Sequence, residues 1–286
     1  MTNPRADLHT HTKASDGLHS PAENVRMAKE NGLAGVAITD HDTVAGIPEA
    51  MEEGNRLGIT VIPGVEISTA AGGQDIHVLG YFMNTEDPVF LERLKSLRDV
   101  RENRNRLLIE RLRELGVDIT MEAVIANMSK ELKPDETVGR PHFAEFLTAR
   151  GYASDMKDAF DRYLGKDGAA YISPMRIPPS EAVRWIHEAG GCAVLAHPGL
   201  YGQDDLIPEL AQAGLDGLEV FHSDHSAEDE ERYAGLANRH HLFVTGGSDF
   251  HGSRGGSVFH GPIGSRSIPI KGIETMKKRS HFYENS

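Results

Sequence analysis

Histidine and carboxylate residues recur in this sequence at the ends of short apolar runs. His9 and His11 form a His-x-His pair after the first run, and Asp16 lies on the loop that follows. Six more residues of the same types accompany the later runs: His41, Glu66, His77, His197, Asp249 and His251. Imidazole and carboxylate groups are ligands for Zn, Mn and Fe, and a carboxylate can bridge two ions, as two-metal hydrolysis requires. The pattern therefore predicts a hydrolytic site for several divalent metals, which one His-x-His pair alone would not support.

The apolar runs are typical of short strands that alternate with helices around a parallel sheet. We predict seven strands, at residues 6–8, 35–39, 59–63, 76–82, 192–196, 215–221 and 242–245. In an α/β barrel the strands point the same way, so that residues at their C-terminal ends converge at one mouth. His77 does not fit this prediction, because it lies near the start of its run.

Residues 88–170 interrupt the alternation of strands and helices. A long helical pattern runs from Pro88 to Leu115, and shorter helical pieces follow as far as Leu164, without a convincing strand. Before this segment, the capping box that opens at Ser20 predicts one of the short helices between strands. We therefore predict a barrel domain made of residues 1–87 and 171–286, with a helical insertion at 88–170 that covers the barrel mouth.

The composition narrows the class of protein further. The 286 residues carry 30 Lys and Arg against 43 Asp and Glu, and the formal charge of −13 argues against binding to duplex DNA or to an anionic membrane. The single cysteine, Cys192, excludes an intramolecular disulfide and a cysteine-rich metal site. No apolar run approaches the roughly 20 residues of a membrane span, and the N-terminus shows no signal-peptide pattern, so we expect a cytoplasmic enzyme. The sequence does not indicate an oligomeric state.

Five motifs resemble those of the PHP (polymerase and histidinol phosphatase) superfamily, in that family's order. They are Asp7-Leu8-His9-Thr10-His11-Thr12, Ile38-Thr39-Asp40-His41-Asp42, Pro63-Gly64-Val65-Glu66-Ile67, Ala196-His197-Pro198 and Gly247-Ser248-Asp249-Phe250-His251. The chain is most similar to the stand-alone members that act on nucleotides, the nucleoside 3′,5′-bisphosphate phosphatases and the 5′→3′ exoribonucleases. The resemblance implies an α/β fold, a distorted (β/α)7 TIM-like barrel (the PHP fold), with two or three divalent metal ions.

The resemblance also implies how the ligands are shared among three metal sites. Glu66 would bridge the first two sites, and Asp16 stands in the third, where many relatives have a histidine. That acid adds an oxygen ligand, which favours Mn or Fe over Zn. The first site would use His9, His11, Glu66 and Asp249, the second Glu66, His77 and His197, and the third Asp16, His41 and His251.

By the same resemblance, the chain is expected to be a phosphoesterase that hydrolyses phosphate monoesters of nucleotides by a metal-activated hydroxide. Its partner would be a small phosphorylated substrate, either a nucleoside 3′,5′-bisphosphate or the 5′ end of a short oligoribonucleotide. Three alternatives stay open. They are a histidinol-phosphate phosphatase, an amidohydrolase-like enzyme that acts on C–N bonds, and a non-catalytic PHP module that binds metal for stability or docks on a polymerase.

Two residues beside the ligands suggest supporting roles. Asp40 follows a strand next to His41, and we expect it to orient a ligand or to accept a proton. His222 ends another strand, and two interpretations stay open for it. Either it contacts the substrate or protonates the leaving oxygen, or it supports the metal ligands from behind.

Specific binding of phosphate requires cations besides the metals. Arg140 is the first candidate, because a guanidinium binds phosphate through two parallel hydrogen bonds, and we expect His142 to assist it. Arg254, three residues after His251, is a second candidate.

Three arginines on the long helix are a further possibility. Arg98, Arg101 and Arg104 share one helix face by their spacing. The usual explanation of such a run is a solvated helix with internal ion pairs. If this face instead covers the barrel mouth, Arg101 and its neighbours would recognise a second phosphate or a short strand.

Overall fold

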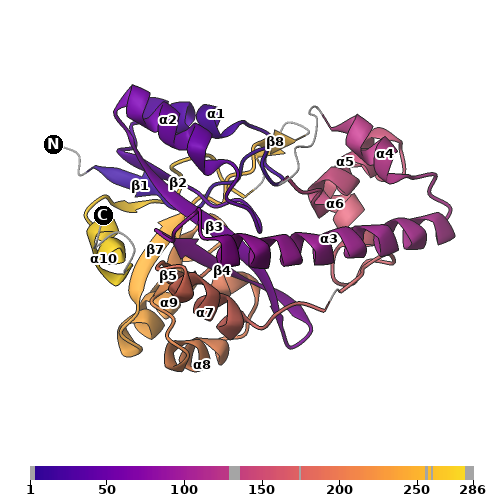
Figure 1. The fold of residues 1–286 in the computed structure, drawn as a ribbon. Helices are drawn as coiled ribbons and strands as arrows, with labels where there is room; N and C mark the ends of the chain where they lie inside the picture. Colours follow the sequence, from indigo (N-terminus) through magenta and orange to yellow (C-terminus); the bar gives the residue numbers. More distant parts are fainter. Residues whose placement is uncertain (1–3, 129–135, 174, 255–256, 259, 281–286) are drawn as a thin grey trace.

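Eight strands form one mixed sheet that curves into a nearly closed barrel (Figure 1). The computed structural model describes residues 4–128, 136–173, 175–254, 257–258 and 260–280. The N–H of Leu8, just after the first strand of the chain, donates to the carbonyl of Gly246 at 3.2 Å. This hydrogen bond joins the N-terminal strand to the strand that contains Gly246, at the far end of the sheet. The predicted α/β barrel is therefore present. Its strands in spatial order are β10 (Ile268–Pro269), β1 (Arg5–Asp7), β2 (Gly35–Ile38), β3 (Thr60–Ala71), β4 (Gln74–Tyr81), β5 (Cys192–Leu195), β6 (Gly217–His222) and β7 (Phe243–Gly247).

Two strands, β10 and β4, differ from the sequence prediction of a parallel sheet, and between them they make three antiparallel pairings. β10 is an eighth strand that was not predicted, and it pairs antiparallel with β1. β4 runs antiparallel to both of its neighbours, because β3 and β4 are the arms of one hairpin. Gly72 and Gly73 turn that hairpin at φ of 58° and 74°, a conformation that suits glycine. The reversal of β4 places its first residues at the mouth, which explains why His77 lies near the start of its strand.

Helices pack on the outside of the barrel, and alternate strand residues face inward. Ala37 and Ile62 belong to the apolar cluster inside the barrel, whereas Val36 and Val61 belong to the cluster beneath the helices. Ser20 caps the first helix with the predicted capping box. The outer cluster contains residues of α1 (Pro21–Glu30), α2 (Ile47–Leu57), α7 (Pro179–Glu188), α8 (Leu206–Gln212) and α9 (Ala227–Arg239), and also of the long helix α3 (Pro88–Glu114). α10 (Gly272–Arg279) instead contributes Ile273 and Met276 to the inner cluster.

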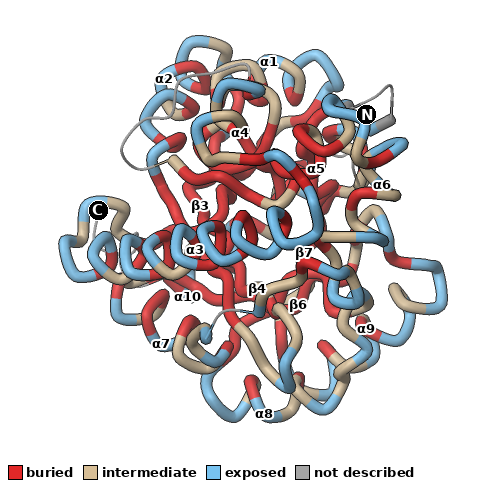
Figure 2. The backbone as a smooth tube through the Cα atoms, turned by 90° about the vertical axis from the view of Figure 1, so that its right-hand side faces the viewer, coloured by how far each residue is buried: buried red, intermediate tan, exposed pale blue. Residues whose placement is uncertain are grey.

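The described residues of the segment 88–170 form a helical layer with an apolar core of its own (Figure 1). Its long helix α3 belongs to both parts: Leu94 packs in the barrel cluster and Leu112 in the second core. One face of α3 is exposed and the other is buried, as Figure 2 shows. None of the helices in the described ranges is long and apolar enough to cross a membrane. The layer consists of α3 (Pro88–Glu114), α4 (Met121–Asn127), α5 (Arg140–Ala149), α6 (Met156–Ala159) and the π-helix η1 (Phe160–Leu164).

Candidate metal centre

Nine side chains predicted as metal ligands lie together at the barrel mouth, and we call them the ligand cluster. Eight of the nine are buried, and His77 is half-buried. They fall into overlapping groups whose ligand atoms lie within 4.8 Å of one another. The groups share members, so the structure does not divide them into three separate sets. The cluster consists of His9, His11, Asp16, His41, Glu66, His77, His197, Asp249 and His251.

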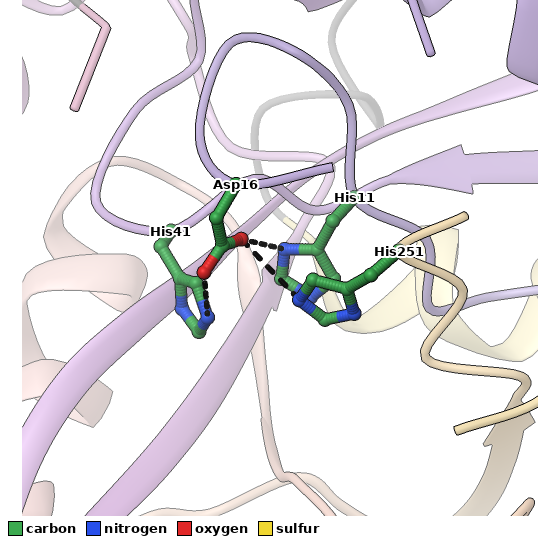
Figure 3. A group of neighbouring side chains, drawn as sticks. All are labelled: His11, Asp16, His41 and His251. Atoms are coloured by element: carbon green, nitrogen blue, oxygen red, sulfur yellow. Dashed lines mark ion pairs between the residues drawn. The ribbon is translucent and has the colours of Figure 1, made fainter. Parts of the chain in front are cut away.

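Asp16 is the centre of one group (Figure 3). Its Oδ1 lies 3.3 Å from His251 Nε2 and 3.9 Å from His11 Nδ1. Its Oδ2 lies 3.8 Å from His41 Nε2. The carboxylate therefore faces three imidazole rings that come from three different loops at the mouth.

Glu66 is the centre of the rest of the cluster. Its Oε1 lies 2.9 Å from His77 Nδ1 and 3.0 Å from His197 Nε2. Its Oε2 lies 3.1 Å from both His11 Nε2 and His41 Nδ1. A carboxylate with imidazoles at both oxygens has the arrangement of a bridge between two ions.

The donor atoms of this cluster fit metal ions better than they fit one another. The Nδ1 atoms of His41 and His77 lie close to Glu66, yet neither contact has hydrogen-bond geometry. Asp249 Oδ1 and the Nδ1 atoms of His11 and His197 are also buried without a hydrogen-bond partner among the described residues. Buried polar atoms are almost always paired, so this concentration of unpaired imidazole and carboxylate atoms indicates a shared cationic partner.

Most protonation states in the cluster suit metal binding. Burial raises the pKa of the acids, but neighbouring histidines hold the pKa values of Asp16, Glu66 and Asp249 well below their usual range. Burial lowers the pKa of His197 to about 4, against the opposing effect of Glu66. Ionised carboxylates and neutral imidazoles are the forms that bind metal. His9 and His11 are the exceptions. Burial lowers their pKa values, but Asp249, Glu219 and Glu66 raise the pKa of His9 well above its ordinary value, and Asp249 and Glu66 raise the pKa of His11 to about 10.

The backbone at two ligands has an uncommon conformation. His197 has φ of 25° and Asp249 has φ of 54°, in the left-handed region that residues with side chains seldom adopt. Such conformations persist where the surroundings fix them, and they gather at functional sites. Each is the second residue after its strand, β5 for His197 and β7 for Asp249, and the unusual φ turns the side chains toward the cluster.

Asp40 and His222, predicted as catalytic residues, contact the ligand cluster or the loop that carries Asp16. Asp40 accepts hydrogen bonds from Thr12 N–H at 2.8 Å and from the hydroxyls of Thr12 and Ser15 at 2.6 Å, so it fixes the loop that carries Asp16. His222 is fully buried, with Nε2 3.3 Å from Asp249 Oδ2. This contact joins His222 to a member of the ligand cluster, and both interpretations of His222 stay predictions.

Glu219 holds two ligands in place, and the sequence analysis did not single it out. It is fully buried on β6, and its oxygens lie 3.1 and 3.2 Å from His9 Nδ1. Its Oε2 also accepts the backbone N–H of His197 at 2.9 Å. A carboxylate on the far nitrogen of a ligand imidazole fixes the tautomer and orientation of the ring. An acid within the apolar run 215–221 was the available signal.

His260 is a second residue that the sequence analysis passed over, since it was assigned to the loops and the tail. It lines the same pocket as the ligand cluster, and its Nε2 lies 3.3 Å from Asp249 Oδ2. Burial lowers its pKa, but Asp249 and Asp224 raise the pKa above its ordinary value overall. Loop histidines carry no periodic signal, so only the fold brings this residue to the site.

Four arginines line the other side of the same pocket: Arg101, Arg104, Arg140 and Arg176. We call this set the arginine pocket. Arg98, Arg101 and Arg104 are all buried, so the interpretation of α3 as a solvated face is wrong. The reason is that this face of α3 packs across the barrel mouth, where Arg98 donates to the carbonyl of Asp42.

The three other predicted phosphate contacts differ in their surroundings, and of them Arg140 belongs to the arginine pocket. Arg140 Nη1 donates to Asp75 Oδ2 at 2.9 Å, and its guanidinium stacks over Tyr171. His142 is buried and its Nδ1 accepts the N–H of Gly139 at 3.0 Å, so it holds the start of α5. The side chain of Arg254 lies outside the described part of the chain.

A barrel whose mouth gathers histidines and carboxylates from several strands defines a metal-dependent hydrolase scaffold. Residues 7–165 match the PHP domain, and the chain belongs to the PHP family of phosphoesterases, which are hydrolases of phosphoester bonds. The 5′-3′ exoribonuclease Rnm of Escherichia coli (strain K12) is 38% identical over 252 residues, which cover 86% of this chain and 84% of that protein. The 3′,5′-nucleoside bisphosphate phosphatase of Chromobacterium violaceum is 34% identical over 264 residues, 89% of this chain and 90% of that one.

A solved structure supports the same assignment. A Bifidobacterium adolescentis protein assigned as a metal-dependent phosphoesterase superposes with a TM-score of 0.88 at 32% identity. The superposition covers 96% of both chains, so it includes the helical layer as well as the barrel.

Proposed function

We propose that this protein hydrolyses phosphate monoesters of nucleotides, and that its substrates are nucleoside 3′,5′-bisphosphates and the 5′ ends of short oligoribonucleotides. One observation carries the proposal: seven members of the ligand cluster line the same pocket as the four arginines of the arginine pocket. A substrate with two phosphates offers one to each side. The names of two relatives, an exoribonuclease and a nucleoside bisphosphate phosphatase, support a nucleotide substrate.

The ligand cluster would hold two or three divalent ions around Glu66 and Asp16. Bound there, the ions would polarise the phosphoryl oxygens and lower the pKa of a water molecule. Mn²⁺ suits the mixture of imidazole nitrogens and carboxylate oxygens, and Fe and Zn accept the same donor types. The remaining residues of the chain bind and orient the substrate.

Arginines perform that binding in our proposal. Arg140 and Arg101 bind phosphate oxygens through paired N–H groups, and stacking on Tyr171 keeps the Arg140 guanidinium in one plane. Asp40 keeps the Asp16 loop in place, and His222 holds Asp249 from behind. His142 acts indirectly, by holding the helix start that carries Arg140.

Phosphate release from a panel of substrates with added Mn²⁺ tests the proposal. The panel contains adenosine 3′,5′-bisphosphate, a 5′-phosphorylated trinucleotide, adenosine 3′- and 5′-monophosphate, and histidinol phosphate. We expect the highest kcat/KM with the bisphosphate or the trinucleotide, because only these offer an anion to both sides of the pocket. The Glu66→Gln variant, purified in the same way, measures the background from contaminating phosphatases.

Two outcomes would overturn the proposal. A higher kcat/KM with histidinol phosphate than with any nucleotide would favour the histidinol-phosphate phosphatase alternative. No phosphate release from any nucleotide above the Glu66→Gln background would exclude a nucleotide phosphatase.

A further inference from the structure

Arg104 is a buried guanidinium with too few partners. It is 1% exposed, and its Nε and Nη2 atoms have no hydrogen-bond partner among the described residues. A buried charge without a counter-ion destabilises a fold, and replacing it by an apolar residue of similar size is often stabilising. The presence of Arg104 in the lining of the pocket therefore indicates that the pocket binds an anion other than the carboxylates of its neighbouring side chains.

The neighbours of Arg104 add positive charge to the same place. Arg101 donates to Asp42 Oδ2 and to Ser68 Oγ, both at 2.7 Å. Arg140 and Arg176 share a different carboxylate, that of Asp75. Four guanidinium groups thus share two carboxylates, and the surplus positive charge is concentrated around Arg104.

Asp75 is held much less firmly than Asp42. Arg176 Nη1 lies 3.3 Å from Asp75 Oδ1, yet this contact lacks hydrogen-bond geometry, and both atoms are without a hydrogen-bond partner among the residues described. The side chain of Asp75 is 21% exposed and follows the Gly72-Gly73 turn. The side chain of Asp42 is 1% exposed and also accepts the N–H of Ser68 at 2.8 Å.

We propose that Arg104 and Arg176, with Arg101 and Arg140, form a second anion subsite for a phosphate group that is not cleaved, and that Asp75 competes with this phosphate for Arg140 and Arg176. The subsite rests on the proposed function, since it would receive the second phosphate of a doubly phosphorylated nucleotide. Asp75 then determines specificity: only an anion that attracts the two arginines more strongly than a carboxylate displaces it.

A phosphate monoester meets this condition for a chemical reason. It carries close to two negative charges near neutral pH and has three terminal oxygens, which accept N–H donors from several directions. A carboxylate offers one charge and two oxygens in one plane. The tetrahedral group can therefore receive Arg104 together with Arg140 and Arg176, whereas Asp75 leaves Arg104 without a partner.

Calorimetric titration of the full-length, Mn²⁺-loaded protein with inorganic sulfate tests the subsite. Sulfate is a tetrahedral dianion that binds guanidinium groups without precipitating Mn²⁺. We expect saturable binding to the natural protein, loss of that binding in Arg104→Met, and about 10-fold tighter binding in Asp75→Asn. Arg106→Met and Asp99→Asn are matched controls, since both residues are exposed on α3, and both should bind sulfate as the natural protein does. The metal content of every variant is measured in parallel.

Unchanged sulfate binding in Arg104→Met would overturn the proposal, as would the absence of saturable binding to the natural protein. Weaker binding in Asp75→Asn would mean that Asp75 only positions the arginines, and would overturn its role as a competitor. Arg104→Met should also raise the Tm, and a lower Tm would indicate a structural ion instead. These readouts do not depend on turnover. Absence of nucleotide hydrolysis would refute the proposed function, whereas the sulfate titration by itself decides whether the subsite exists.

Discussion

The two sides of the pocket carry uncompensated charge of opposite sign. In the ligand cluster the carboxylates of Asp16, Glu66 and Asp249 face imidazoles and are held ionised. In the arginine pocket four guanidinium groups face two carboxylates. One side therefore favours cations and the other favours an anion, and the two meet in one pocket of a protein whose formal charge is −13.

The comparison shows that net charge does not decide what such a pocket binds. Three acids at the mouth contribute to the negative total, yet bound divalent ions would neutralise them. The arginines, at the same time, come from α3, from the start of α5 and from the segment that precedes α7, so their charge is local to the mouth. With those ions bound, the proposed phosphorylated substrate would meet positive charge on both sides of the pocket.

We expect the largest effect from a substitution in the ligand cluster, the negatively charged side of the pocket. Glu66→Gln keeps the shape of the side chain but removes the charge that five imidazoles approach. We expect bound metal to fall and phosphoesterase activity to drop by at least about 100-fold, more than the effect of losing a residue behind the ligands. Elemental analysis and phosphate release measure the two changes.

Glu52→Gln on α2 is the matched control, because Glu52 is exposed. It should keep the metal content and activity of the natural protein. Full activity in Glu66→Gln would contradict the assignment of the ligand cluster to catalysis.

A second variant is designed to weaken metal binding by the ligand cluster without removing a predicted ligand. Glu219→Gln leaves His9 in place but replaces the charged acceptor at its Nδ1. Metal affinity should fall by about 10- to 100-fold, and activity should return at high Mn²⁺ concentration. Competition with a fluorescent chelator measures the affinity, with the exposed Glu231→Gln on α9 as control. Lost activity that excess Mn²⁺ does not restore would show a role other than positioning the ligand.

The third variant addresses the positive side. Arg140→Lys keeps the charge but loses the planar pair of donors and the stacking on Tyr171. We expect about a 10-fold rise in KM for a nucleoside bisphosphate, consistent with the loss of one charged hydrogen bond, and little change in kcat. Steady-state kinetics of Arg140→Lys and of the exposed Arg150→Lys control measure the effect. A fall in kcat at constant KM would place Arg140 in the chemical step instead.

The two sides also differ in how far the sequence predicts them. The members of the ligand cluster belong to short sequence motifs at the ends of strands. They could therefore be predicted as metal ligands without knowledge of how the chain packs. Even there, the location of His77 at the mouth depends on the β3–β4 hairpin. Gly72-Gly73 is a local signal for that hairpin, but the prediction of a parallel sheet did not use it. Glu219 and His260 reach the cluster only through barrel closure and loop packing, which leave no periodic pattern.

The arginine pocket depends on contacts between distant segments. Helical spacing correctly put Arg98, Arg101 and Arg104 on one face of α3. Whether that face meets water or the barrel mouth is decided by packing, because Leu94 anchors one end of α3 on the barrel and Leu112 anchors the other end on the second core. Arg176 lies in an irregular segment before α7, and no spacing connects it with α3.

A buried acid without a cation nearby provides the contrast to the acids of the ligand cluster. Asp7 is fully buried on β1, and burial raises its pKa to about 6, although the N–H groups of His9, Ser248 and Gly264 donate to its oxygens. Histidines lower the pKa of Asp16 in an equally buried place. The same residue type therefore shifts in opposite directions, according to whether positive charge lies beside it.

The smallest expected effect tests this contrast through the pH dependence of stability. A folded-state pKa above the ordinary value of 3.8 means that the folded protein binds the Asp7 proton more tightly than the unfolded chain does. The resulting stabilisation is complete below about pH 4 and is lost as the pH rises through about 6. Between pH 5 and pH 6 the natural protein should lose about 1 kcal/mol of unfolding free energy that Asp7→Asn does not lose, as measured by urea unfolding of both proteins with a chelator present. An equal loss in both proteins would mean that Asp7 is already ionised at pH 5, and that the backbone N–H groups compensate its burial as fully as histidines do at Asp16.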